Sequence, residues 1–340
     1  ASAGSTVRPG PGVLLASGGA ATERIAGAVW RTSALALLWA TLLLAPSIAQ
    51  ASACCAGSTS AAVGRLGGGE QAGLYVSLGL EGRTATWDGE GGVHAAERDR
   101  REAIILGIEG ALRVDRRFQF GGSMPLRVQH RALGEENAWG VGPGDLRTWL
   151  RFEPMEDVGG PKSAPVPALG FALILPTGIP ASAAPDPLGA GATGSGYVSL
   201  GPVLSLERSG SRGSFEVGGQ LLASLPPPDA PPSRVPGVGW SLGLSGAAFL
   251  SPSVTLSGSI GADGLSPGLH DGRPSGDGSI RPLLGAGVAM KLRRSGKERL
   301  SIGLSGHPPI PGLGRSREAT LALSVTLSAV RLEPWARRAR

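Results

Sequence analysis

The sequence predicts an all-β protein that folds as a single antiparallel up-and-down transmembrane barrel of about 12 strands. Three observations lead to this prediction. Apolar and polar residues alternate with a period of two over most of the chain, short and long connections alternate between the predicted strands, and the non-apolar face carries few charges. The composition agrees, because 56 glycines and 28 prolines in 340 residues disfavour a mostly helical fold.

The N-terminal 53 residues are predicted to be a leader and signal peptide. Arg24 and Arg31 precede an apolar run over residues 33–45, which is too short for a membrane-spanning helix, and the small residues at 51–53 form a cleavage site. A buried helix is the alternative interpretation of the run. Cys54 follows the cleavage site, so lipidation of this cysteine stays open, as does the true start of the chain.

Alternation justifies each predicted strand in turn. In the first strand Leu74, Val76 and Leu78 alternate with Tyr75 and Ser77, which gives one apolar face. The same pattern predicts strands over 104–114, 118–129, 146–152, 166–177, 196–208, 212–225, 236–250, 253–263, 277–292, 297–306 and 317–331. The barrel is therefore placed at 72–331, after a short periplasmic segment at 54–71 and before a basic tail at 332–340.

The connections between these strands alternate in length. Short turns are predicted at 115–117, 209–211, 251–252 and 293–296, with an intermediate connection at 154–165. Longer loops are predicted at 88–100, 132–144, 178–195, 226–235, 264–276 and 307–316. Short and long connections thus fall at opposite ends of the meander, as in bacterial outer-membrane barrels with short periplasmic turns and long external loops. An even strand count brings both termini to the periplasmic side.

The chemistry of the two faces favours a membrane barrel over a soluble one. The apolar face is a nearly uncharged band of Leu, Val, Ile, Phe and Ala, and the other face is rich in Gly, Ser and Thr. A charge on a lipid-facing position costs about 2–4 kcal/mol at mid-bilayer, so a band without charges is expected there. A soluble all-β protein is the alternative, and the aromatic content of only 4% is the main observation in its favour.

The distribution of charge argues against nucleic acid as a partner. The net charge is +6, but much of the excess lies in the leader and in the tail arginines Arg337, Arg338 and Arg340, and the body is close to neutral. The expected partners are outer-membrane lipid, small solutes and the barrel-assembly machinery during insertion. The oligomeric state is left open.

The inner face offers candidates for a pore lining. Arginines outnumber acids there, and rings of arginine favour anions. The alternative is that these arginines pair with acids and plug a narrow lumen. By alternation, the predicted lining residues are Arg127, Arg131, Arg147, Trp149, Arg151, Glu81, Glu109 and Glu216.

The sequence predicts no catalytic residue, no metal site and no cofactor. The four histidines, His94, His130, His270 and His307, show no spacing typical of metal ligands. The glycines at 189–194 have the spacing of a dinucleotide-binding motif, but no helix is predicted after them. An outer-membrane lipid hydrolase stays open as a third alternative, because such enzymes use Ser, His and Asn, and His130 is predicted to face outward.

Two short stretches resemble a known family. Residues 140–146 (Gly-Val-Gly-Pro-Gly-Asp-Leu) lead into one predicted strand, residues 173–178 (Leu-Ile-Leu-Pro-Thr-Gly) end the next, and a Gly-rich stretch follows at 189–196. This arrangement resembles the outer-membrane β-barrel transporter-like family named for the MetA pathway of phenol degradation, although Pro143 is an addition within the Gly-Asp motif. The resemblance implies a porin-like channel in the outer membrane of a Gram-negative bacterium. The resemblance does not assign binding residues to this sequence.

Overall fold

The computed structural model describes residues 66–67, 70–87, 93–95, 99–154, 165–225, 234–235, 237–270, 273–275, 278–292, 297–308 and 318–332. The predicted leader and signal peptide, Cys54 and the tail at 333–340 lie outside these residues, so the statements about them stay predictions. Among the described residues, no helix is long and apolar enough to cross a bilayer.

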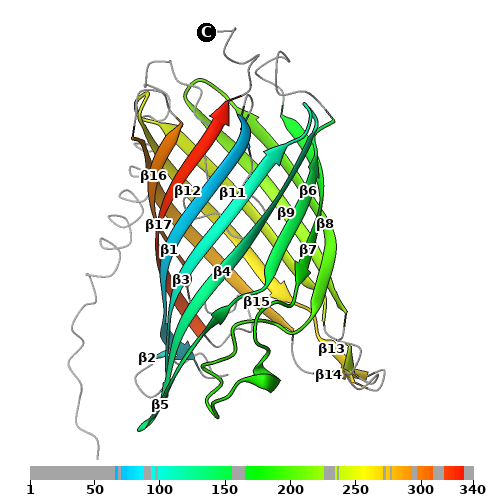
Figure 1. Ribbon diagram of the computed structural model, residues 1–340, viewed down its shortest axis with the longest axis vertical. Coiled ribbons are helices and arrows are strands. Elements are labelled where there is room, and N and C mark those ends of the chain that lie inside the picture. The colour runs from blue at the N-terminus through cyan, green and yellow to red at the C-terminus, as the bar shows by residue number, and fades with distance from the viewer. Residues whose placement is uncertain are drawn as a thin grey trace, which may run out of the picture. The chain divides into compact units, whose positions relative to one another are not determined.

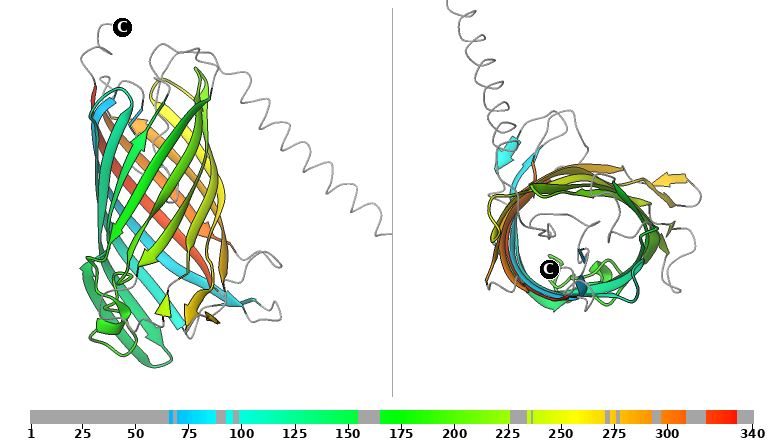
Figure 2. Two further views of the ribbon diagram at one scale, coloured as in Figure 1. Left: turned by 90° about the vertical axis from the view of Figure 1, so that its right-hand side faces the viewer. Right: turned by 90° about the horizontal axis from the view of Figure 1, so that it is seen from above.

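Twelve antiparallel strands close into a barrel, which confirms the predicted fold class (Figures 1 and 2). Each strand pairs with its neighbours along the chain, and the last strand pairs with the first, from Glu70↔Leu332 to Thr86↔Glu318. Their order around the ring is β1 (Glu70–Trp87), β3 (Asp99–Arg113), β4 (Phe118–Leu133), β6 (Leu146–Phe152), β7 (Val166–Leu175), β8 (Val198–Ser209), β9 (Gly213–Leu225), β11 (Gly239–Phe249), β12 (Val254–Leu265), β15 (Ser279–Lys291), β16 (Glu298–His307) and β17 (Glu318–Leu332).

Five short strands and one helical turn lie among the long connections. β2 (Val93–Ala95) pairs with the end of β1, and η1 (Ala181–Ala183) lies between β7 and β8. A separate small sheet is formed by β10 (Arg234–Val235), β13 (Gly268–His270) and β14 (Arg273–Ser275). All of these elements lie at the end of the barrel opposite the chain termini of β1 and β17, at the lower end in Figure 1. We call this the long-loop end, and the other the short-turn end.

One predicted connection was wrong. Residues 132–144 were expected to form a long loop, but β4 continues to Leu133 and β5 (Glu136–Pro143) pairs back along it. Gly134 has a φ of 63° in the tight turn between them. Trp139 and Val141 do alternate with Gly140 and Gly142, but the prediction failed because this short run lies among Gly134, Pro143 and Gly144, residues that are typical of loops.

The outer surface of the barrel carries the large apolar side chains. Leu74, Leu78 and Leu80 of β1 are each at least 50% exposed, and the same alternate positions are exposed around the ring. By contrast, two of the three largest fully buried side chains, Gln119 and Glu153, are polar. A soluble barrel would show the reverse arrangement, so the exposed apolar belt is typical of strands that face lipid.

Candidate functional site

The barrel interior has two chemically different sides. Charged side chains gather on the inner faces of β1, β3, β4, β6, β8 and β9, which we call the charged wall. On the opposite side, the inward residues midway along β11, β12, β15, β16 and β17 are small and uncharged. We call this side the small-residue wall. Its members include Gly243, Ser245, Ser257, Ser259, Gly285, Gly287, Ser301, Gly303, Ser324 and Thr326. Any path for a solute runs between these two walls.

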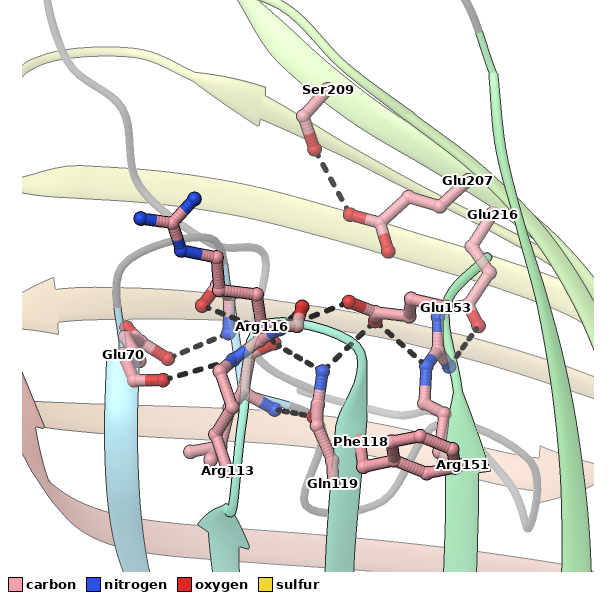
Figure 3. Close-up of polar contacts among 12 residues, drawn as sticks. Glu70, Arg113, Arg116, Phe118, Gln119, Arg151, Glu153, Glu207, Ser209 and Glu216 are labelled. Atoms are coloured by element: carbon pink, nitrogen blue, oxygen red, sulfur yellow. Dashed lines mark hydrogen bonds and ion pairs between the residues drawn. The ribbon is translucent and has the colours of Figure 1, made fainter. Parts of the chain in front are cut away.

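A buried polar network lies at the short-turn end, with Glu153 at its centre (Figure 3). Its Oε2 accepts from Arg113 Nη1 at 3.1 Å, and its Oε1 accepts from Gln119 Nε2 at 2.9 Å and from Arg151 Nε at 3.0 Å. Arg151 Nη1 also lies 4.0 Å from Glu216 Oε1. Because Glu153 follows β6, whose strand ends at Phe152, its carboxylate can turn inward and join the two arginines.

The same network holds the residues just before β1. The backbone N–H of Leu66 donates to Gln119 Oε1 at 3.1 Å, and its carbonyl accepts from Arg113 Nη2 at 3.1 Å. Gly67 N–H donates to Glu70 Oε2 at 2.9 Å, and Arg299 Nη2 donates to Glu70 Oε1 at 2.8 Å. Leu66 itself is completely buried.

Further along the charged wall, a hydrogen bond passes through the lumen between two strands that are not neighbours. Arg147 Nη2 of β6 donates to Gln220 Oε1 of β9 at 2.7 Å, although β7 and β8 lie between these strands in the ring. Glu109 of β3 is also buried on this wall. Trp149 lies over Gly121, where a Cβ would collide with the indole ring. These side chains narrow the lumen from one side.

A structured loop covers part of the long-loop end. Residues 176–197 pack on the inner face of the β4–β5 hairpin, where Gln129 Nε2 donates to the Ala192 carbonyl at 2.9 Å and Arg131 Nη1 donates to the Leu188 carbonyl at 3.0 Å. Gly140 is needed for this approach, because a Cβ there would collide with the Ala190 carbonyl. Figure 1 shows this loop beside β5, below the barrel.

Asp186 organises the tip of this loop. Its carboxylate accepts from the backbone N–H groups of Ala190 and Gly191, both at 2.7 Å. The bond from Gly191 is the largest influence that lowers the pKa of Asp186, with the positive charge of Arg131 contributing in the same direction.

The two family-like motifs contact each other in the structure. Asp145 Oδ1 accepts from Gly178 N–H at 3.2 Å, and its Oδ2 accepts from Ser195 N–H at 2.7 Å. Thr177 Oγ1 donates to the Gly144 carbonyl at 2.7 Å and accepts from Leu146 N–H at 2.9 Å. The motifs therefore join the break between β5 and β6 to the start of the loop at 176–197.

A second polar group lies at the long-loop end of the small-residue wall. His307 Nε2 lies 3.1 Å from Asp263 Oδ1, and His307 Nδ1 lies 2.9 Å from Thr320 Oγ1. Arg281 also pairs with Asp263. The cluster ties β12, β15, β16 and β17 together near the mouth.

The structure separates the predicted lining residues into different settings. Arg151 and Glu216 belong to the short-turn network, whereas Arg147, Glu109 and Trp149 lie at mid-barrel. Arg131 binds the docked loop. Arg127 and Glu81 lie on the inner face of β4 and β1, and among the described residues neither makes an ion pair. That these side chains line a conducting path stays a prediction.

Alternation missed the residues that hold the short-turn network together. Gln119 alternates with Phe118 and Phe120, so its inward direction was readable, but its partners depend on the closed register of the barrel. Glu153 lies just beyond a strand, where a period of two assigns no face. Leu66 lies before the first strand, and no sequence pattern marks it as an interior residue.

The described residues also bear on the hydrolase alternative. His130 faces outward as predicted, stacks on Trp139 with ring centroids 4.5 Å apart, and lies 3.6 Å from Glu102. The one serine of β3, β4 and β5 is Ser123, which pairs with Arg147 on the inner face. These strands therefore supply no serine to His130. No group of residues suited to hold a metal ion occurs in the described part of the chain.

Comparison with known proteins supports the fold. No family model and no curated protein match the chain. Among solved structures, an outer membrane channel from Pseudomonas putida F1 is similar with a TM-score of 0.61 and 12% identity, covering 83% of this chain and 100% of that chain. The NanC porin is less similar, with a TM-score of 0.44 and 8% identity, covering 76% of this chain and 100% of that chain. The beta domain of the Bordetella autotransporter BrkA is also less similar, with a TM-score of 0.43 and 12% identity, covering 77% of this chain and 100% of that chain. The first likeness shows that this chain has the fold of outer-membrane barrels.

Proposed function

We propose that this protein is a porin-like channel of the bacterial outer membrane that passes small solutes through the lumen of its barrel. The observation that carries the proposal is the closed barrel with an exposed apolar belt outside and a polar, charged interior. The channel of similar fold from Pseudomonas putida supports it. Membership in the MetA-pathway family and insertion by the barrel-assembly machinery are part of the same proposal.

Location and conduction need separate measurements. Sucrose-gradient fractionation and heat-modifiable gel mobility are expected to place the protein in the outer membrane as a folded barrel. Recovery as a soluble periplasmic protein would contradict the proposal. Single-channel recording after reconstitution into planar bilayers then tests whether the lumen conducts.

The inner-face charges favour a modest preference for anions. In the short-turn half, positive and negative side chains balance. In the long-loop half, the described strands carry five inward positive side chains against four negative ones. These are Arg83, Arg101, Arg127, Arg131 and Arg281 against Glu81, Asp99, Glu136 and Asp263. Asp186 of the docked loop offsets this excess near Arg131, so the proposed preference rests on Arg127, which makes no ion pair among the described residues. Positive side chains that line a pore favour anions.

Arg127 is the best residue on which to test selectivity, because among the described residues it makes no ion pair whose loss would disturb the barrel. Arg127→Glu is expected to move the reversal potential under a salt gradient toward cation selectivity. Arg100→Glu is the matched control, since Arg100 lies one strand away at the same end but faces outward. A conducting channel whose reversal potential does not change with Arg127→Glu would refute the anion preference.

A plugged barrel without conductance is the second candidate function. It is favoured by the Arg147–Gln220 hydrogen bond and by the Arg113–Glu153–Arg151 network, since both place paired side chains inside the lumen. Electrical silence of the folded protein, together with no flux of small solutes into liposomes, would favour this candidate over the channel.

A further inference from the structure

We propose that solutes cross the barrel along the small-residue wall, because the hydrogen bond between Arg147 and Gln220 covers the inner face of β7 and β8. Gln220 is then a positioning residue that holds the Arg147 guanidinium to one side of the lumen, and the small-residue wall sets the width of the path. The inference rests on the proposed channel function and adds the course of the path and the residues that determine which solutes fit.

The Arg147–Gln220 hydrogen bond lies in front of two strands. Arg147 projects inward from β6 and Gln220 from β9, and β7 and β8 lie between these strands in the ring. Because the bond joins the two flanking strands, its side chains pass over the inner face of β7 and β8, which we call the covered arc. The distance of 2.7 Å from Nη2 to Oε1 is that of a direct hydrogen bond, so no solute passes between the two side chains.

Small residues of the covered arc are buried, although they face the lumen. Ala172 of β7 has no exposed surface, its neighbour Gly201 on β8 is buried, and Ser205 of β8 is 8% exposed. These residues lie on the inner face, because large apolar residues of the same strands alternate with them and are exposed outside. Side chains this short leave room in front of them. Larger side chains therefore fill that room and exclude solvent from the arc.

Residues of the same size on the small-residue wall have a different setting. Ser257 and Ser259 of β12 and Ser324 of β17 also project inward at mid-barrel, and all three are only half-buried. Chemically equal residues thus differ in access to the lumen, and the difference follows the side of the barrel on which they lie. This contrast between Ser205 and Ser257 favours a path along the small-residue wall.

Gln220 determines the direction of the Arg147 side chain. Glu109 attracts Arg147 the other way, since Glu109 pairs with Ser123 of β4 and Ser123 pairs with Arg147 of β6. Among the described residues, Glu109 Oε1 has no hydrogen-bond partner. Loss of the Gln220 amide should therefore let the Arg147 guanidinium turn toward Glu109, away from β8, and uncover Ser205.

The first test compares two thiols of equal size on opposite sides of the lumen. In the full chain with Cys54→Ser and Cys55→Ser, Ser257→Cys is expected to react with sulfonatoethyl methanethiosulfonate during single-channel recording and to lose current in a step. The matched variant Ser205→Cys is expected to react at least about tenfold more slowly, because its thiol is reached only when the covering side chains move.

The second test addresses the positioning role of Gln220. Adding Gln220→Ala to Ser205→Cys is expected to raise the rate of thiol modification at least about tenfold, toward that of Ser257→Cys. Gln220→Glu is expected to keep the slow rate, since a carboxylate at this position still accepts from Arg147. Gln129→Ala is the control, because Gln129 binds the external loop, and it should leave the rate unchanged.

The outcomes separate the path from the channel function. Equal rates and equal loss of current for Ser205→Cys and Ser257→Cys would overturn the path and leave the channel function standing. The same holds if modification of Ser257→Cys leaves the current unchanged. A slow Ser205→Cys that Gln220→Ala does not accelerate would overturn the role of Gln220. Absence of current in the parent protein and in every variant would overturn the channel function together with the path.

Discussion

Glu153 is the residue whose loss should destabilise the barrel most clearly. Its buried carboxylate accepts hydrogen bonds from Gln119 and from the guanidinium groups of Arg113 and Arg151. Breaking a buried ion pair by removal of one partner costs about 3–5 kcal/mol, because a charge is left buried without compensation. In Glu153→Ala, Arg113 keeps carbonyl partners and Arg151 keeps Glu216 at 4.0 Å. We therefore expect Glu153→Ala to lower the free energy of unfolding by about 3 kcal/mol, the lower end of this range.

This loss is measurable against a total stability of about 5–15 kcal/mol. The assay is urea unfolding in phospholipid vesicles, followed by tryptophan fluorescence and by heat-modifiable gel mobility. Glu135→Ala is the control, since Glu135 is exposed in the β4–β5 turn, and it should change stability by less than about 0.5 kcal/mol. Adding Arg151→Met to Glu153→Ala should recover part of the loss. A loss below about 1 kcal/mol for Glu153→Ala would refute the reasoning.

Three further predictions follow from the loop and the outer face. The pKa of Asp186 is lowered, so its contribution to loop stability is fully present above the ordinary carboxyl pKa of about 4 and is lost as the pH falls through the lowered value. Protease sensitivity of residues 176–197 should therefore stay constant down to about pH 4 and rise below it, and Asp186→Asn should abolish that dependence. Gly140→Val should displace the same loop and expose it to protease at neutral pH, whereas Gly82→Val, with no atom near its Cβ position, should not. Leu323 lies on the exposed outer face, so Leu323→Arg should destabilise the barrel by about 2–4 kcal/mol in vesicle unfolding. Ser324→Arg, at the next residue, faces the lumen and should cost less. Equal losses would contradict the assignment of faces.

The strands were predictable because alternation is a local property. The expected segments at 212–225, 253–263 and 297–306 differ from β9, β12 and β16 by only one or two residues at their ends. The extension of β4 and the presence of β5 were missed, because the glycines and Pro143 of this short run are typical of loops. Their place is fixed by backbone pairing and by the loop that packs on them.

The direction of inner side chains was predictable, but their partners were not. Arg147 and Arg151 were expected to act alike, since both face inward from β6. The closed ring gives Arg147 an amide partner on β9 and gives Arg151 a carboxylate that follows its own strand. Such pairs depend on the curvature of the barrel and on residues outside the strands, and neither is encoded in a period of two.

The pairing of β1 with β17 is expected to be the last strand pairing to form during biogenesis. The first and last strands of the barrel form a seam that runs from Glu70↔Leu332 to Thr86↔Glu318. The closing contact joins the most distant parts of the barrel sequence, so it is the costliest in chain entropy and the slowest to form. Until β17 has arrived, β1 and β16 each present an unpaired edge to the bilayer or to another chain. A chain that lacks its last strand is therefore expected to be an aggregation-prone open sheet and a substrate for quality-control proteases.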